Sequence, residues 1–363
     1  MNLGLILAIG EGFKDFKSKG QDRLLVEQNI KAYSQNFGKV FVFSYEKEKY
    51  PLYKNCQLVA NHTWLHRYLY SLAMPLIHSK EFKKCDVLRG LQITGGIPCV
   101  IAKLLYGKSY VINYGYDYEK ISKIEKKYVQ AFFYKLLTPI ILRFADAVIV
   151  TTKALEEKIK KIRTENVYSI PNGADIKKFS PARKKLKSSL KKILFVGRLE
   201  PQKNLLSLIK AVSKLRVKNE LIFVGQGSQK NELLKLANKL KVNLKIIDKV
   251  SHNQLPKIYN SADIFVLPSL AEGNPKVLLE AMSTELACIG TDTEGIREII
   301  SDKETGLLTG TKPEQISEAI EYIVKNPQIA IQLGERARKY VKENFDFANV
   351  MEKENSLLKS LTK

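Results

Sequence analysis

Two cationic residues follow an apolar run in a way that suits the binding of an anion. Residues 192–197 end in Gly197; Arg198 follows directly, and Lys203 comes five residues after Arg198. A guanidinium and an ammonium bind phosphate well, and a glycine lets a ligand approach the backbone closely. We interpret this stretch as one side of a diphosphate site. The alternative is a surface loop with two solvated cations.

A second stretch places two carboxylates around the start of an expected helix. Glu272 lies in a loop after the strand-like residues IFVLPS (264–269), and Glu280 lies in the helix that we expect from Pro275 onward. The backbone N–H groups at the start of such a helix can face a phosphate, helped by the helix dipole. One carboxylate can then accept hydrogen bonds from a ribose and the other from a sugar. The alternative interpretation makes Glu272 a simple loop carboxylate and Glu280 a solvated helix residue.

The elements that carry these residues alternate between strand-like and helix-like segments along the whole chain. Apolar runs at residues 3–9, 39–45, 146–152 and 192–198 are separated by helical patterns, which is typical of βαβ units and parallel sheets. The fold class predicted is therefore α/β. A proline-, glycine- and lysine-rich stretch at 166–192 interrupts the alternation and predicts a domain boundary. The ligands of such sheets bind beyond the carboxyl ends of the strands.

The composition sets limits on the class of protein. The chain has 363 residues and a net charge of +23, which is spread over both halves and favours anionic partners. Its four cysteines have neither zinc nor redox spacing, and its four histidines show no metal-ligand spacing. The first residues are expected to form a buried strand rather than a signal peptide, and no run is long enough to span a membrane. We expect a cytoplasmic protein without a bound metal.

The charged stretches and their order resemble one large family. The residues EGNPKVLLE (272–280) and GRLEPQKN (197–204) match the signature of retaining glycosyltransferases with the GT-B fold, known as family 4 or glycosyl transferases group 1. The stretches IPNGAD, FVGQGSQKNEL and GTDTEGIREII follow the family's order as well. The resemblance covers residues 165–310 most closely. It implies two Rossmann-like αβα domains that face each other across a cleft.

The resemblance also implies roles and boundaries. Residues 1–173 would bind the acceptor, residues 174–340 would bind the nucleotide-sugar, and residues 341–363 would pack back on the first domain as a helix. Arg198, Lys203 and Glu272 would be the catalytic group, with the two cations on the donor diphosphate and Glu272 on its sugar. Glu280 would hold the ribose. The other residues expected to bind the donor are Gly197, Gly225, Val250, Leu255, Asn274, Pro275, Lys276, Val277 and Leu278.

The first half matches the family less well. Gly10 and Gly12 are accepted as the loop that follows the first strand, and Tyr114 stands where the family often has a histidine. Asp117, in the segment Gly-Tyr-Asp-Tyr, completes the residues expected on the acceptor side. The departure at Tyr114 puts in doubt any mechanism that needs the histidine; the alternative is that Tyr114 is an aromatic side chain that lines the cleft.

The predicted activity is the transfer of a sugar from a UDP- or GDP-sugar to a glycan or lipid-linked acceptor, in cell-surface polysaccharide or glycolipid synthesis. The resemblance implies retention at C1, no cofactor beyond the nucleotide-sugar, and no divalent metal. Three alternatives are a nucleotide-sugar-binding protein that has lost its activity, a basic nucleic-acid-binding protein and a dinucleotide-dependent enzyme. The last is disfavoured because VGQGSQK has Lys230 in place of a third glycine.

A lysine-rich apolar stretch at residues 120–144 suggests a further partner. One hypothesis is an amphipathic helix that lies on anionic lipid, which would place the protein peripherally on the inner face of the membrane. The alternative is a long domain helix that packs its apolar stripe inward.

Overall fold

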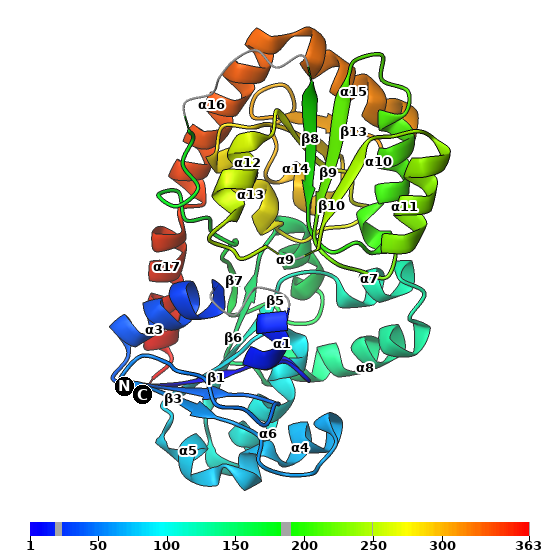
Figure 1. Cartoon of the computed structure of the whole chain (residues 1–363). Coiled ribbons are helices and arrows are strands. Elements are labelled where there is room, and N and C mark those ends of the chain that lie inside the picture. The colour runs from blue at the N-terminus through cyan, green and yellow to red at the C-terminus, as the bar shows by residue number, and fades with distance from the viewer. Residues whose placement is uncertain (19–23, 183–189, 249, 363) are drawn as a thin grey trace. The chain divides into compact units, whose positions relative to one another are not determined.

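The apolar runs form the strands of two sheets in a computed structural model, which describes residues 1–18, 24–182, 190–248 and 250–362 (Figure 1). One structural unit comprises Met1–Glu119, Val129–Ile170 and Met351–Lys363, and the other comprises Lys120–Tyr128 and Pro171–Val350. The chain thus passes between units at 119/120, 128/129, 170/171 and 350/351, whereas the boundaries predicted from the sequence are 173/174 and 340/341. Residues 183–189, part of the expected linker, lie outside the described residues.

The first unit is built on a seven-stranded sheet with the strand order β3-β2-β1-β4-β5-β6-β7, and every pairing between these strands is parallel. The strand order reverses between β1 and β4, which lie next to each other in the sheet. The strands are β1 (Asn2–Ile6), β2 (Lys39–Phe43), β3 (Cys56–Val59), β4 (Val87–Gly90), β5 (Ser109–Tyr114), β6 (Ala147–Val150) and β7 (Val167–Ser169).

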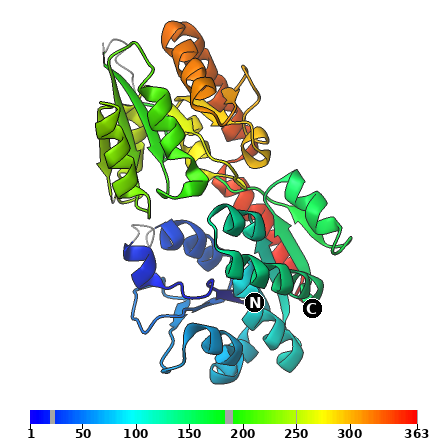
Figure 2. The ribbon, with the colours of Figure 1, turned by 90° about the vertical axis from the view of Figure 1, so that its right-hand side faces the viewer.

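Helices cover both faces of this sheet (Figures 1 and 2). Thr152 caps the helix that follows β6, because its hydroxyl accepts a hydrogen bond from the backbone N–H of Leu155 at 3.2 Å. The helices of this unit are α1 (Phe13–Ser18), the π-helix η1 (Leu25–Ile30), α3 (Lys31–Asn36), α4 (Arg67–Ile77), α5 (Ser79–Lys84), the 3₁₀-helix η2 (Ile93–Gly95), α6 (Gly96–Tyr106), α8 (Tyr128–Phe144), α9 (Lys153–Lys160) and, from Met351 onward, the carboxy-terminal α17 (Phe347–Ser360). Helix α7 (Tyr118–Ile124) begins in this unit and belongs to the second unit from Lys120.

The second unit repeats the design with a six-stranded parallel sheet of order β10-β9-β8-β11-β12-β13. Its strands are β8 (Lys191–Val196), β9 (Asn219–Val224), β10 (Leu244–Ile247), β11 (Ile264–Leu267), β12 (Ala287–Thr291) and β13 (Leu307–Thr309). Its helices are η3 (Pro201–Lys203), α10 (Leu205–Val212), α11 (Lys230–Lys239), α12 (Leu255–Ser261), α13 (Lys276–Ser283), α14 (Glu294–Arg297), α15 (Pro313–Lys325) and α16 (Pro327–Asn344).

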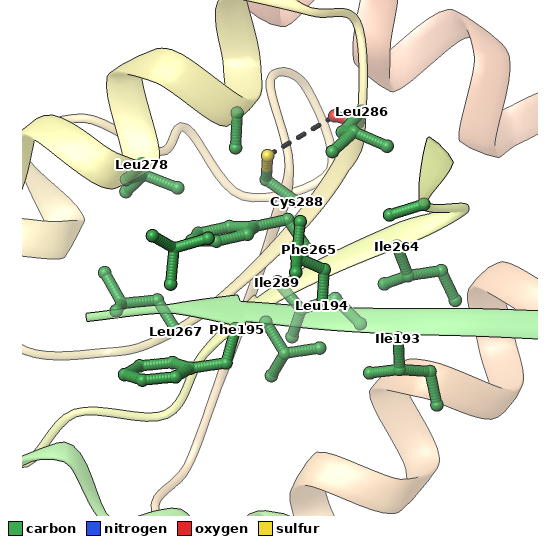
Figure 3. Packing of buried hydrophobic residues seen from close by; sticks show 14 of the residues in the cluster. Ile193, Leu194, Phe195, Ile264, Phe265, Leu267, Leu278, Leu286, Cys288 and Ile289 are labelled. Carbon is green, nitrogen blue, oxygen red and sulfur yellow. Dashed lines mark hydrogen bonds between the residues drawn. The ribbon is translucent and has the colours of Figure 1, made fainter. Parts of the chain in front are cut away.

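The central strands of the second sheet are apolar on both faces because helices cover both sides. In Figure 1, α10, α11 and α15 lie on one side of the sheet and α12, α13 and α16 on the other. Phe195 on β8 and Phe265 on β11 are fully buried in this core, and Figure 3 shows Phe265 on the same side as Leu278 of α13 and Cys288 of β12 and Phe195 on the opposite side. The predicted α/β class with two Rossmann-like units is thereby confirmed. Among the described residues, the structure holds no helix that is both apolar and long enough to cross a lipid bilayer.

Candidate functional site

The charged residues singled out in the sequence follow the two strands at which the order of the second sheet reverses. Gly197 comes directly after β8, and the loop that carries Glu272 comes after β11, the neighbour of β8 on its other side. Loops at such a reversal diverge to opposite faces of the sheet and leave a crevice at the carboxyl ends of the strands, where ligands of open α/β sheets bind. The fold therefore brings the two charged stretches to one edge.

Glycines allow the loops at this edge to touch. Gly197 has φ +153° and Gly225 has φ +143°, both in the region that favours glycine, and a Cβ on Gly225 would lie 1.9 Å from the carbonyl oxygen of Gly197. A Cβ on Gly227 would lie 2.3 Å from the carbonyl oxygen of Leu199. The two glycines of VGQG thus have a packing role, which accounts for the motif without a dinucleotide.

Lys203 and Glu272 form an ion pair with each other across the two loops. Their side chains are only 11% and 9% exposed. Gln202 joins the same loops, since its Nε2 donates to the carbonyl oxygen of Ala271 at 2.5 Å and its own carbonyl accepts from the backbone N–H of Leu270 at 2.8 Å. The loop after β8 is therefore fastened to the loop after β11 by one charged and two neutral contacts.

Arg198 is the more open of the two cations. Its side chain is 58% exposed, and its Nη2 lies 3.4 Å from Oε1 of Gln202 and 3.6 Å from Oε1 of Glu125. At these separations the guanidinium keeps most of its five donors for another acceptor. Arg198 therefore presents the fork that a phosphate needs at the carboxyl edge of the second sheet.

Glu280, which the sequence left open as a solvated helix residue, is buried with both carboxylate oxygens hydrogen-bonded. His252 Nε2 lies 2.9 Å from its Oε1, and the Tyr259 hydroxyl donates to its Oε2 at 3.0 Å. Burial, and then the negative charge of Glu280, raises the pKa of Tyr259 well above its ordinary value. Tyr259 therefore stays a neutral donor at physiological pH.

A lysine assigns the tautomer of His252. Lys178 Nζ lies 2.9 Å from His252 Nδ1. Because an ammonium can only donate, Nδ1 must be the acceptor, and the proton of the neutral ring sits on Nε2, where it is donated to Glu280. The chain Lys178–His252–Glu280 thus fixes the direction in which the carboxylate points. Sequence analysis missed His252, since it lies 28 residues from Glu280 and no local spacing relates the two.

The loop between Glu272 and α13 is held from two sides. Asn172 donates from its backbone N–H to Oδ1 of the Asn274 side chain at 3.0 Å and from its own Nδ2 to the Asn274 carbonyl at 2.5 Å. On the other side, a Cβ on Gly295 would lie 1.6 Å from the carbonyl oxygen of Gly273. The motifs IPNGAD and GTDTEGIREII therefore serve to shape this loop.

The start of α13 lies next in the chain. Pro275 is the residue before the helix, and the first turn contains Lys276, Val277 and Leu278. The early N–H groups of a helix lack partners within it and carry partial positive charge. Leu278 is fully buried and packs its side chain into the core, so only its backbone could serve a ligand. Leu255, which begins α12, and Val250 also pack against the core of the second unit.

The residues expected on the acceptor side lie in the first unit. Gly10 has φ +78°, and a Cβ on Gly12 would lie 2.4 Å from Cγ of Glu46. These glycines follow β1, one of the two strands at the reversal of the first sheet. Glu48 accepts from the backbone N–H groups of Phe13 and Lys14, at 3.0 and 2.8 Å, and so caps the helix that follows.

Tyr114 is the last residue of β5, and Asp117 lies in the segment between β5 and α7. Tyr114, at the end of β5, is 2% exposed and belongs to the core of the first unit, where its ring lies 5.4 Å from that of Tyr118. Burial raises its pKa above the ordinary value. Asp117 forms an ion pair with Lys158, with 2.5 Å between its Oδ2 and the Lys158 Nζ. Their part in binding an acceptor stays a prediction.

In the described part of the chain, no group of three or more histidine, cysteine, aspartate or glutamate residues is placed to hold a metal ion.

Comparison with known proteins identifies the class. Residues 176–340 match the family model described as glycosyl transferases group 1. An uncharacterized glycosyltransferase of Methanocaldococcus jannaschii is 30% identical over 264 residues, which cover 68% of this chain and 67% of the relative. A UDP-Gal:alpha-D-GlcNAc-diphosphoundecaprenol alpha-1,3-galactosyltransferase of Escherichia coli is 31% identical over 254 residues, which cover 64% of this chain and 62% of that protein.

The fold agrees with that class. The solved structure of a sucrose-phosphate synthase from Thermosynechococcus elongatus superimposes with a TM-score of 0.84 at 18% identity and covers 99% of both chains. The chain has the GT-B fold and belongs to the glycosyl transferases group 1 family, as its motifs indicated. It is accordingly a glycosyltransferase by family.

Proposed function

We propose that the protein transfers a sugar from a nucleotide-sugar to a glycan or lipid-linked acceptor, with retention at the sugar's C1 and without a divalent metal. The single observation that carries this proposal is the placement of Arg198, Lys203, Glu272 and Glu280 on the loops and helix that follow β8 and β11, the strands at the reversal of the second sheet. Two cations, a helix start and two carboxylates at such an edge suit a pyrophosphate that joins two sugars.

In this proposal Lys203 serves phosphate and carboxylate together. An ammonium has three donors, so Lys203 can keep its contact with Glu272 while another N–H meets a phosphate oxygen. The remaining lone pairs of Glu272 accept from hydroxyls of the transferred sugar. The ion pair thereby sets the distance between the pyrophosphate and the sugar that leaves it.

Glu280 would hold the ribose in the same proposal. His252 and Tyr259 occupy one acceptor position on each of its two oxygens, and a carboxylate offers about four such positions in all. The remaining positions can accept from ribose hydroxyls without loss of the two buried hydrogen bonds. His252 and Tyr259 then orient the carboxylate before the nucleotide arrives.

Negative charge grows on the pyrophosphate as the bond to the sugar breaks. Arg198, Lys203 and the first N–H groups of α13 are fixed positive groups at the site of that charge, and such stabilisation is commonly the largest catalytic contribution. No side chain is assigned as a covalent nucleophile. The acceptor attacks from the face that the pyrophosphate leaves, and the pyrophosphate assists by accepting the proton.

The donor and acceptor classes are supported by a relative. The Escherichia coli protein acts, by its name, with UDP-Gal on a diphosphoundecaprenol-linked sugar. We infer a UDP- or GDP-sugar donor and an acceptor used in cell-surface polysaccharide or glycolipid synthesis.

A panel of UDP-, GDP- and ADP-sugars tests the donor by thermal shift, because a ligand that binds the folded state raises the melting temperature. The matching donor should raise it in the wild type and not in Arg198→Ala, with Lys214→Ala, in an exposed ion pair elsewhere in the unit, as the control. No shift with any nucleotide-sugar would contradict the proposal.

Turnover of that donor then separates an enzyme from a binding protein. Slow hydrolysis of the donor without acceptor, unchanged by a chelator, is the expected result for a metal-independent transferase. Binding without any hydrolysis would support the binding protein, and loss of hydrolysis in the chelator would contradict metal independence. The anomeric configuration of the product reports retention directly.

A further inference from the structure

Helix α8 presents large apolar side chains outward as well as inward. Its buried positions are occupied by Ala131, Thr138, Ile141 and Leu142. Its exposed positions include larger apolar side chains, whose exposed fractions run from 41% to 73%: Val129, Phe132, Phe133, Leu136, Ile140 and Phe144. A helix that only packed on its domain would keep such side chains inside and turn polar ones to water. Both alternatives raised by the sequence are therefore incomplete, since the helix packs inward and also has an apolar outer face.

The neighbouring helices continue this outer face. Trp64, in the loop before α4, is 88% exposed. The exposed large apolar residues of α4 and α6 are Tyr68, Leu69, Leu72, Leu76, Leu104 and Leu105. Monomeric proteins rarely expose contiguous apolar patches of this kind unless another surface covers them.

The three helices lie side by side in one layer. The Tyr106 hydroxyl of α6 donates to the carbonyl of Pro75 in α4 at 3.0 Å. A Cβ on Gly96, the first residue of α6, would lie 2.3 Å from Cγ2 of Ile141 in α8, so these helices also touch. Figure 1 draws α4, α6 and α8 on the same side of the first sheet. Their exposed apolar residues, with Trp64, form what we call the apolar helical face.

The charges on this face are positive. Arg67 of α4 and Lys135 and Arg143 of α8 are exposed among the apolar residues, and neither helix contains an aspartate or glutamate. Aromatic and aliphatic side chains mixed with cations are the combination that inserts into the boundary between lipid headgroups and acyl chains. Cations there are attracted by anionic lipid.

We propose that the apolar helical face docks on the surface of an anionic lipid bilayer. A second copy of the chain fits it less well, because a two-fold contact would bring the cations of two copies together while α4 and α8 offer no carboxylate to pair with them. The inference stands apart from the proposed donor chemistry, since it concerns the first unit and lipid alone.

Cosedimentation of the full chain with vesicles tests this proposal. The wild type should bind vesicles of phosphatidylcholine mixed equally with phosphatidylglycerol, and bind vesicles of phosphatidylcholine alone more weakly. The double variant Phe132→Ser/Phe133→Ser should bind the mixed vesicles roughly tenfold more weakly, because two aromatic side chains no longer leave water. Lys135→Glu/Arg143→Glu should remove the preference for anionic vesicles.

A matched control removes exposed apolar side chains elsewhere. Val217→Ser/Tyr322→Ser changes two exposed residues of the second unit and should bind like the wild type. If Phe132→Ser/Phe133→Ser fails to fold, Leu69→Ser/Leu72→Ser on α4 makes the same test. Absence of binding to either vesicle, or wild-type binding by the variants, would overturn the proposal. A dimer in solution that the Phe132→Ser/Phe133→Ser variant dissociates would assign the face to a second copy instead.

Discussion

Lys203 and Glu272 lie 69 residues apart in the sequence and form an ion pair with each other at the carboxyl edge of the second sheet. The sequence assigned one to a phosphate and the other to a sugar, as independent contacts. Because both side chains are almost buried, each charge depends on the other, and whatever binds here meets a pair that is already oriented.

The first prediction concerns the stability of this pair. Glu272→Gln keeps the shape of the side chain and leaves the Lys203 charge without its partner, which should lower the free energy of unfolding by about 3 kcal/mol. Urea denaturation of the purified variant measures this. Glu314→Gln breaks the exposed pair of Glu314 with Lys214 and should change little, since water already solvates both groups. Equal effects of the two substitutions would contradict the assignment.

The second prediction separates catalysis from folding at Arg198. This side chain is largely exposed and makes only long contacts, so Arg198→Ala should leave the free energy of unfolding within about 0.5 kcal/mol of the wild type. Loss of a fixed charge on the leaving pyrophosphate should lower kcat/KM for the donor by roughly 10²–10³. A variant with wild-type kcat/KM would remove Arg198 from the site, and Lys214→Ala controls for the loss of a cation in general.

The sequence was sufficient for the parts of the fold that local patterns determine. Apolar runs fix β1, β2, β6 and β8, because strands buried on both faces of a parallel sheet need them. The residues after β8 and β11 could be assigned to one edge because topology brings together the carboxyl ends of neighbouring strands.

Other features depend on contacts between distant segments and leave no local pattern. The sequence predicts Glu280 either as a ribose ligand or as a solvated helix residue, and only the fold brings Tyr259 and His252 to its two oxygens. Aromatic residues such as Phe132 and Phe133 are usually buried in the core of a domain, yet in this helix both side chains are exposed. Apolarity predicts burial against some surface, and the sequence does not say whether that surface belongs to the same chain.

The third prediction tests His252 as a positioning residue. His252→Leu leaves Oε1 of Glu280 without a donor, so the carboxylate is no longer held toward the ribose. The KM for the nucleotide-sugar should rise about tenfold, with a smaller change in kcat, which corresponds to about 1.4 kcal/mol for one unmade hydrogen bond to a buried charge.

His252→Gln supplies the control, because its amide can donate to Glu280 and should recover part of the affinity. A merely structural role would lower the melting temperature of both variants and leave the KM of the folded fraction unchanged. That outcome would exclude positioning by His252.

The fourth prediction concerns the carboxy-terminal helix. Glu354 of α17 accepts from Arg89 Nε at 2.6 Å and from the Tyr33 hydroxyl at 2.5 Å, within the first unit. Arg89 and Glu354 are almost fully buried, and burial together with the Glu354 charge raises the pKa of Tyr33 well above its ordinary value. In the sequence Glu354 lies 265 residues from Arg89 and 321 residues from Tyr33, so one carboxylate joins segments that are far apart in the chain.

Glu354→Gln should lower the free energy of unfolding by about 3–5 kcal/mol, because it leaves the buried Arg89 guanidinium uncompensated. Tyr33→Phe keeps the ion pair and removes one hydrogen bond to a charged group, which should cost about 2 kcal/mol. Glu352→Gln, at an exposed position of the same helix, is the control for a lost carboxylate and should stay near the wild type. If Glu352→Gln and Glu354→Gln unfold at the same urea concentration, the carboxylate of Glu354 does not hold α17 to the first unit, and the apolar residues of that helix must do so alone.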